Sequence, residues 1–212
     1  LSTLIIARGA KLNANGTAAA PIIMTTTSDD IEIGQTQGSL LNVNVRGLWG
    51  GLLILGNAPC SFSGDVTELQ IEGIPASDAN GLYGGNDATD NSGTITFVSI
   101  RHGGAEIGES NEINGLTLAG IGSATTINNI EVVANVDDGI EFFGGTVNAS
   151  NLLVWGQGDD GLDIDQAYAG TIDNSMVILN DASDHAFEID GPEGSATGSF
   201  TITNSTIIGA AD

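Results

Sequence analysis

The second half of the chain consists of repeated segments. Segments with a shared layout begin at residues 125, 146 and 171, and a fourth copy begins at residue 199 with SFTITNSTIIG. Each opens with a short apolar strand after an asparagine, continues through a polar turn and reaches a second strand behind an acidic pair. One such unit cannot bury its apolar face alone, whereas stacked units share a continuous core. The repeat, with a period of 21 to 28 residues, therefore predicts a solenoid.

The kind of solenoid follows from the pattern inside each repeat. Leucine-rich repeats have a similar length, but their leucine spacing and helical return are missing here. No segment shows sustained apolar recurrence at i, i+3, i+4 and i+7, and 31 glycines against 4 prolines favour short strands joined by tight turns. We predict an all-β fold with almost no α-helix: a right-handed parallel β-helix that forms a single domain over residues 1–212.

The first half is less regular. Residues 2–26 alternate strands with glycine and asparagine turns, and VRGLWGGLLILGNAP contains a strongly apolar strand. Residues 60–92 are too polar and glycine-rich for a simple coil, so we expect a long loop that projects from it. Both ends of the chain are strand-like and lack a polar capping repeat. Either the chain is a segment of a longer coil, or another copy covers its ends by end-to-end self-association.

Alignment of the repeats places equivalent residues in columns along the coil. Asparagines form one column, which we interpret as structural because stacked asparagine side chains can hydrogen-bond along a coil. Upstream, Asn114 and Gly115 align with Asp138 and Gly139. The asparagine column contains Asn129, Asn151, Asn174 and Asn204, and two acidic columns contain Asp137, Asp159 and Asp184, and Glu141, Asp163 and Glu188.

The charge balance limits the partners. The chain has 27 acidic residues against 4 lysines and arginines, a formal charge of −23, which repels nucleic acid and anionic membrane surfaces. The sequence contains no apolar run of 18 residues and therefore does not predict a membrane-spanning segment. The lone Cys60 excludes an intrachain disulfide, and the 41 % of hydrophobic residues argues against disorder.

The acidic columns suggest a calcium site. Coils of a β-helix lie about 4.8 Å apart, and carboxylates at that interval repel by roughly 3 to 4 kcal/mol per pair at an effective dielectric of about 20. A Ca²⁺ ion midway between two coils would lie about 2.4 Å from each, within its usual oxygen distance. The alternative is a solvated face whose side chains cap glycine turns, and the spacing leaves both open. The candidate ligands are Asp137, Asp138, Glu141, Asp159, Asp160, Asp163, Asp165, Asp184 and Glu188.

Several longer motifs carry a resemblance to a known group of proteins. They include ARGAKLNANGTAAAPIIMT, RGLWGGLLILGNAP, SIRHGG, NEINGLTLAGIGSATTINNIEVVANVDDGIEFFGGTVN and GDDGLDID. With these motifs the chain resembles the right-handed parallel β-helix superfamily that includes pectate lyases and polygalacturonases. More narrowly, it resembles secreted or cell-surface β-helix proteins of environmental bacteria. The resemblance implies the fold and an extracellular location, but the superfamily holds lyases, hydrolases, adhesins and phage tailspikes.

Our first hypothesis is a non-catalytic structural or adhesive protein of a bacterial surface, stabilised by calcium and assembling end to end into filaments. The alternatives are a polysaccharide-active enzyme, either a glycoside hydrolase or a polysaccharide lyase, and a carbohydrate-binding module that uses the 60–92 loop. The expected partners are a second copy of the chain, by end-to-end association, and an extracellular polysaccharide.

The enzyme alternatives start from two residue sets. Asp159, Asp160 and Asp163 would act as hydrolytic carboxylates, although the Gly-His-Gly and Arg-x-Lys elements that accompany such a pair in polygalacturonase-like enzymes are missing. Arg101 and His102 would supply the base and the cation of a lyase, and the competing interpretation is a strand end with a structural histidine.

Other side chains have simpler interpretations. His185 aligns with Asp138 and Asp160, and we interpret it as a turn residue rather than a ligand. The large aromatic residues could form a sugar-stacking surface, but for most of them we expect a place in the core; they are Trp49, Trp155, Phe142, Phe143 and Tyr168.

Overall fold

Two parallel sheets form the walls of the molecule in the computed structural model, which describes residues 2–105 and 113–210. Neighbouring strands within each sheet come from successive turns of the chain. Sheet A contains, in spatial order, β1 (Leu4–Ile6), β4 (Leu52–Leu55), β8 (Leu116–Ala119), β10 (Ile140–Phe143), β12 (Leu162–Asp165) and β14 (Phe187–Ile189). Sheet B contains β15 (Thr201–Thr203), β13 (Thr171–Ile178), β11 (Ala149–Trp155), β9 (Thr126–Val133), β7 (Gly93–Arg101) and β2 (Leu12–Asn15), with β3 (Ile22–Met24) beside β7 and β16 (Thr206–Ile208) beside β13.

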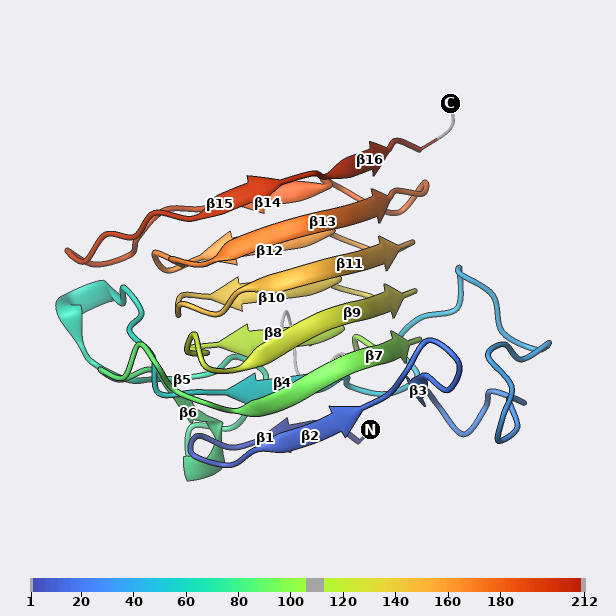
Figure 1. The fold of residues 1–212 in the computed structure, drawn as a ribbon, viewed down its shortest axis with the longest axis horizontal. Helices are drawn as coiled ribbons and strands as arrows, with labels where there is room; N and C mark the ends of the chain where they lie inside the picture. Colours follow the sequence, from blue (N-terminus) through green and yellow to red (C-terminus); the bar gives the residue numbers. More distant parts are fainter. Residues whose placement is uncertain (1, 106–112, 211–212) are drawn as a thin grey trace.

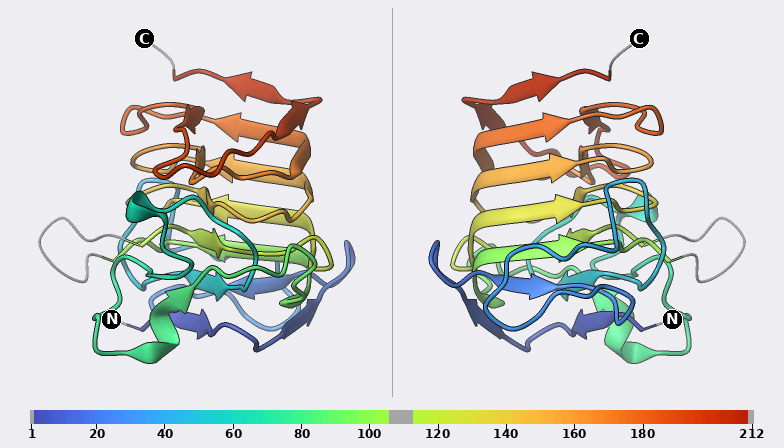
Figure 2. Two further views of the ribbon diagram at one scale, coloured as in Figure 1. Left: turned by 90° about the vertical axis from the view of Figure 1, so that its left-hand side faces the viewer. Right: turned by 90° about the vertical axis from the view of Figure 1, so that its right-hand side faces the viewer.

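The chain winds as a right-handed parallel β-helix, which confirms the predicted fold. In Figure 1 the strands of sheet B run from left to right in front, those of sheet A return behind them, and the chain climbs from the N-terminal to the C-terminal end. Figure 2 shows the same coils stacked edge-on. Within the described ranges there is no α-helix, only 3₁₀ turns at Ser63–Asp65 and Ala79–Gly81, and hence no helix long and apolar enough to cross a membrane.

The strand register confirms the alignment of the repeats. Ile130 of β9 pairs with Leu152 of β11, and Leu152 pairs with Ser175 of β13. On the other sheet, Asp163 of β12 pairs with Glu141 of β10. Asp163 also pairs with Glu188 of β14, so the predicted acidic column is a real row on sheet A.

The asparagine column marks a bend in β9, β11 and β13 and the junction between β15 and β16. Asn129, Asn151, Asn174 and Asn204 all have φ of 55° or 56°, in the left-handed region that asparagine tolerates better than most residues. Their side chains also link the coils: Asn151 Nδ2 donates to Asn128 Oδ1 at 2.9 Å, and Asn174 Nδ2 donates to Asn151 Oδ1 at 2.5 Å. The structural interpretation of this column is therefore confirmed.

The core lies between the two sheets. Alternate residues of each sheet A strand point inward, such as Ile140 and Phe142 of β10, and pack against residues of sheet B such as Val132 and Val154. Phe142, Phe143 and Tyr168 are buried as expected, whereas Trp155 is 42 % exposed. The alternation leaves Glu141 and Phe143 on the outer face of sheet A.

Residues 60–92 do not simply project from the coil, which corrects the prediction for this segment. Phe62, Ile71 and Tyr83 are buried and pack on the outer face of sheet A against Leu55 and Phe143. Within the segment, β5 (Leu69–Gln70) pairs antiparallel with β6 (Leu82–Tyr83). The prediction failed because the polar composition of the segment hid three widely spaced apolar side chains that together form a second small core.

Candidate functional site

A cleft on the outer face of sheet A collects carboxylates from three successive coils. The turns before β10 and β12 contribute aspartates, and the outward positions of β10, β12 and β14 contribute one acidic side chain each. The cleft has a volume of about 420 Å³ and is lined by Glu72, Asp137, Asp138, Glu141, Asp159, Asp163 and Glu188. None of the 4 lysines and arginines, all of which the structure describes, lines it.

The second aspartate of each acidic pair connects neighbouring coils. Asp138 Oδ1 accepts a hydrogen bond from the backbone N–H of Asp160 at 3.0 Å. One coil further, Asp160 Oδ1 accepts from the backbone N–H of His185 at 2.7 Å. These bonds join successive coils, and both aspartates are buried, so for Asp138 and Asp160 the alternative of a solvated face that caps its own turns is not what the structure has.

Glu141 is the most deeply placed carboxyl group of the cleft. It is 5 % exposed, and Asn114, which is 1 % exposed, donates a hydrogen bond from Nδ2 to its Oε2. On the other side, the carboxyl groups of Glu141 and Asp163 are hydrogen-bonded to each other. Two neighbouring oxygens, Asn114 Oδ1 and Asp163 Oδ1, are buried and have no hydrogen-bond partner among the described residues.

Burial raises the pKa values of the carboxyl groups in this cleft. The pKa of Asp138 is raised to about 9, mainly by burial and then by the charge of Asp137. Burial and the charges of Asp138 and Asp163 raise the pKa of Glu141 well above its usual value. The pKa of Glu188 is raised to about 7, first by its hydrogen bond with Asp160. Without a bound cation, these shifts keep protons on some carboxyl groups of the cleft at neutral pH.

Three groups of side chains bring potential metal-ligating atoms within 4.8 Å of one another. Two of these groups lie in the cleft and contain only carboxylates. The groups are Asp137, Asp138 and Asp159; Asp138, Glu141 and Asp163; and Asp160, His185 and Glu188.

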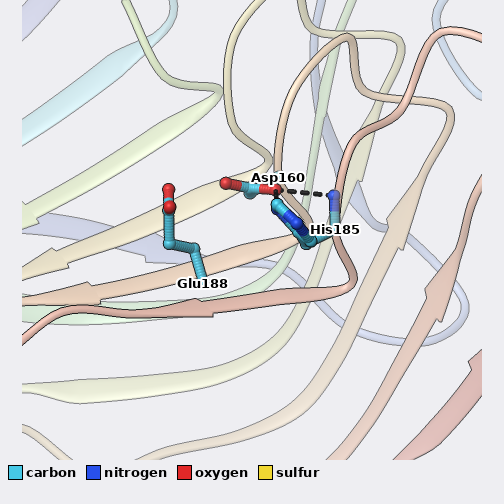
Figure 3. Close-up of side chains that lie close together, drawn as sticks. All are labelled: Asp160, His185 and Glu188. Carbon is cyan, nitrogen blue, oxygen red and sulfur yellow. Dashed lines mark hydrogen bonds and ion pairs between the residues drawn. The ribbon is translucent and has the colours of Figure 1, made fainter.

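The third group lies at the C-terminal side of the cleft (Figure 3). His185 faces Asp160, with Nδ1 3.1 Å from Asp160 Oδ1, and Glu188 stands beside the pair. The charges of Asp184 and Asp160 raise the pKa of His185, which favours the imidazolium. The predicted role of His185 as a turn residue agrees with the hydrogen bond that its backbone N–H donates to Asp160. The ion pair between the two side chains is an additional contact.

Two other candidate ligands lie away from the cleft lining. Asp165 pairs in register with Phe143 on the outer face of β12, and burial raises its pKa to about 6. Asp184 is largely exposed, with Oδ1 3.6 Å from His185 Nε2. The structure thus brings together six of the nine candidate ligands in the cleft lining and places Asp160 beside it.

The residues of the lyase alternative lie elsewhere. Arg101 ends β7 on sheet B, where Nη2 is 3.0 Å from Glu131 Oε2 and Nε donates to Ser99 Oγ at 2.7 Å. His102 is buried, with Nδ1 2.6 Å from the carbonyl oxygen of Val45. Both line a second cavity, separate from the cleft that contains Asp159 and Asp163.

Sequence reasoning missed two residues of the site. Glu72 reaches the cleft from the segment that covers sheet A, and no repeat pattern could have placed it there. Asn114 was aligned with Asp138 but was not proposed as a ligand. Its position in that column was the available signal, since an amide oxygen at an otherwise acidic level supplies another hard ligand.

Comparison with known proteins agrees with the fold. A family model described as a pectate-lyase-like β-helix domain matches residues 2–212. Neither a curated protein nor a solved structure matches the chain. The parallel sheets and the extent of the family match together show that the chain belongs to the family of pectate-lyase-like β-helix domains.

Proposed function

We propose that the acidic cleft binds calcium and that the chain is a calcium-stabilised β-helix module of an extracellular bacterial surface. The observation that carries this proposal is the environment of Glu141. Asn114 Oδ1 and Asp163 Oδ1 flank it as buried oxygens without a partner among the described residues, in a cleft where no lysine or arginine balances the carboxylates. Such buried acceptors carry a large desolvation cost unless a cation or protons satisfy them.

The donor set favours calcium over other metals. The two groups of ligand atoms inside the cleft are carboxylates, and Asn114 adds an amide oxygen next to Glu141. Calcium accepts six to eight oxygens in flexible geometry, whereas Mg²⁺ demands a near-ideal octahedron and Zn²⁺ prefers nitrogen and sulfur ligands. Carboxylates on coils about 4.8 Å apart fit the calcium–oxygen distance of about 2.4 Å.

A bound cation would stabilise the coil by linking its levels. Asp138, Glu141 and Asp163 belong to two successive coils, so one ion contacting all three replaces repulsion between the coils by attraction. Because the unfolded chain has no such arrangement, binding adds to the free energy of unfolding, by about 2.7 kcal/mol at a calcium concentration of 100 times Kd.

The proposed calcium site also supports the proposed location at an extracellular surface. Extracellular calcium modules operate with Kd values of about 10⁻⁴ to 10⁻³ M, which suits a protein that meets abundant calcium outside the cell. End-to-end association of copies of the chain is a second part of this proposal. A structural or adhesive element at the bacterial surface combines both properties.

Thermal unfolding with and without calcium tests the metal proposal. With a Kd of about 10⁻⁴ to 10⁻³ M, 5 mM calcium adds about 1 to 2.3 kcal/mol to the free energy of unfolding. We therefore expect it to raise the Tm of the wild-type protein by about 2 to 9 °C compared with excess chelator, at 2 to 4 °C per kcal/mol for a chain of this size. Glu141→Gln should abolish most of this rise, while Asp181→Asn, the same charge change in an exposed turn outside the lining, should preserve it. Equal Tm values in calcium and in chelator would refute the proposal.

A polysaccharide-active enzyme is the second candidate function. Two observations favour it: the family match, and a cleft in which Asp138 holds its proton up to a pH of about 9 while other carboxyl groups lie beside it. A protonated and an ionised carboxyl group are what glycoside hydrolysis requires. The test incubates the protein with neutral and uronate polymers and measures reducing ends and, by ultraviolet absorbance, unsaturated uronates. Release of either product would support the enzyme function, and no product in both assays would refute it.

A further inference from the structure

A second cavity lies at the ends of the sheet B strands, beneath the segment of residues 25–48. It has a volume of about 330 Å³. The segment is the blue loop beside the arrowheads of β7 and β9 in Figure 1. The residues that matter for its chemistry are Asp29, Gln37, Asn42, Arg101, Glu131 and Trp155.

One wall of the cavity is a row of strand ends. Arg101, Val133 and Trp155 are the last residues of β7, β9 and β11, and the register places them in one line along the coil axis. With coils about 4.8 Å apart, the backbones of Arg101 and Trp155 are about 10 Å apart. The row is therefore a short platform that begins with a cation and ends with an indole.

The polar part of the platform is already fixed in place. Arg101 Nε donates to Ser99 Oγ at 2.7 Å, its Nη1 donates to the carbonyl oxygen of Thr36 at 2.8 Å, and its Nη2 pairs with Glu131 Oε2 at 3.0 Å. Trp49 Nε1 donates to the carbonyl oxygen of Arg101 at 2.6 Å. The bond to Thr36 attaches the 25–48 segment to sheet B, so the cavity exists before any ligand arrives.

The cavity combines an apolar side with a polar side. Trp155 keeps 42 % of its surface exposed and lies beside Val133 and Val43 in the lining. Across from the strand row, the 25–48 segment supplies Asp29, an acceptor, together with the side-chain amides of Gln37 and Asn42, which both donate and accept.

We propose that this cavity binds one neutral pyranose unit of a polysaccharide. A pyranose ring has an apolar C–H face that can pack on the Trp155 indole, and hydroxyl groups that both donate and accept hydrogen bonds, as the side-chain amides of Gln37 and Asn42 do. A purely apolar ligand would displace water from those amides without replacing its hydrogen bonds. An anionic ligand is disfavoured because Glu131 already neutralises Arg101 and Asp29 adds a negative charge.

This site is independent of the proposed calcium cleft. The two cavities share no lining residue. Sugar binding is therefore measured in excess chelator and again in calcium, and the same affinity is expected in both. If the cleft binds no calcium, the proposed sugar site is unaffected. If the cavity binds no sugar, the calcium proposal is unaffected.

Isothermal titration calorimetry and saturation-transfer NMR test the proposal with the methyl glycosides and short oligomers of glucose, galactose and mannose, and with galacturonate oligomers as the anionic comparison. At least one neutral sugar should bind the wild-type chain with a Kd on the order of 1 mM. Trp155→Ala should weaken that binding by about tenfold or more, as expected for an aromatic anchor. Met176→Ala is the matched control, since Met176 is a similarly exposed side chain of sheet B that does not line the cavity.

Asn42→Ala, in the exposed part of the segment, gives a second variant if Trp155→Ala unfolds, and it should weaken the same sugar severalfold. Three outcomes would overturn the proposal: no sugar of the set binds the wild-type chain, the bound sugar is indifferent to both variants, or only the galacturonate oligomers bind.

Discussion

Glu141 of β10 and Asp163 of β12 occupy the same position on neighbouring strands, and their carboxyl groups are hydrogen-bonded to each other. Such a bond requires a proton on one of the two groups. A cation that takes the place of this proton would contact both coils at once. Proton binding and calcium binding at this pair therefore compete, and the predictions about the cleft depend on that competition.

Without calcium, stability should fall as pH rises. The pKa of Asp138 is about 9 in the folded chain, against 3.8 for an ordinary aspartate, so between these values the folded state binds more protons than the unfolded state. The free energy of unfolding then decreases with pH, by up to about 1.4 kcal/mol per pH unit for one such group. Urea unfolding in chelator at pH 5 and pH 8 measures this difference.

The variant Asp138→Asn isolates the contribution of that group. It keeps a side-chain oxygen that can accept from the backbone of Asp160 but carries no titrating proton. The loss of stability between pH 5 and pH 8 should shrink in this variant, while Asp181→Asn should leave it unchanged. A wild-type protein that becomes more stable between pH 5 and pH 8 in chelator would contradict the raised pKa.

Gly139 should be intolerant of a side chain. A Cβ at this position would lie 2.3 Å from Val154 Cγ1 and 2.6 Å from the carbonyl oxygen of Gly161. Gly139→Ala should therefore lower the free energy of unfolding by about 1 to 3 kcal/mol, the usual cost of overpacking. Gly191→Ala is the control, because a Cβ there meets nothing within 4 Å and its φ is not positive. Equal stability of the two variants in urea unfolding would show that sheets A and B are less tightly packed than described.

Asn151 should be replaceable by glycine at lower cost than by alanine. Its φ is 56°, and its side chain bonds Asn128 and Asn174 on the neighbouring strands. Both variants lose those hydrogen bonds, but alanine also bears the strain of the left-handed conformation, about 1 kcal/mol more. Asn13→Ala, at an exposed strand position without positive φ, should change stability by less than about 0.5 kcal/mol. An alanine variant as stable as the glycine variant in chemical denaturation would speak against the backbone explanation.

Cys60 should be nearly inert in the folded chain. Burial raises the pKa of its thiol to about 12, and its Sγ lies 3.3 Å from the carbonyl oxygen of Phe143. Since the thiolate is the reactive form, alkylation at pH 8 should be at least about 100-fold slower in the native protein than in denaturant. Mass spectrometry of timed samples measures both rates, and similar rates would mean that the segment over sheet A opens readily.

The coil was predictable because each repeat specifies its own backbone path. An asparagine that accepts positive φ marks the bend of sheet B, and alternating apolar residues such as Ile140 and Phe142 mark the inward face. Repeats with the same path stack in register, so the row that contains Glu141 and Asp163 followed from alignment alone. Phe97 occupies the same bend with φ of 51° without being an asparagine, which explains why the pattern was weaker in the first half.

By itself, therefore, the sequence determined the solenoid, the inward side chains and the acidic row. Only the tertiary structure decided what covers the outer faces. Phe62, Ile71 and Tyr83 dock residues 60–92 on sheet A and bring Glu72 to the cleft, and residues 25–48 roof the cavity beside Trp155. The reason is physical: these segments repeat nothing, so a few distant apolar contacts and hydrogen bonds fix their positions, and no local pattern records such contacts.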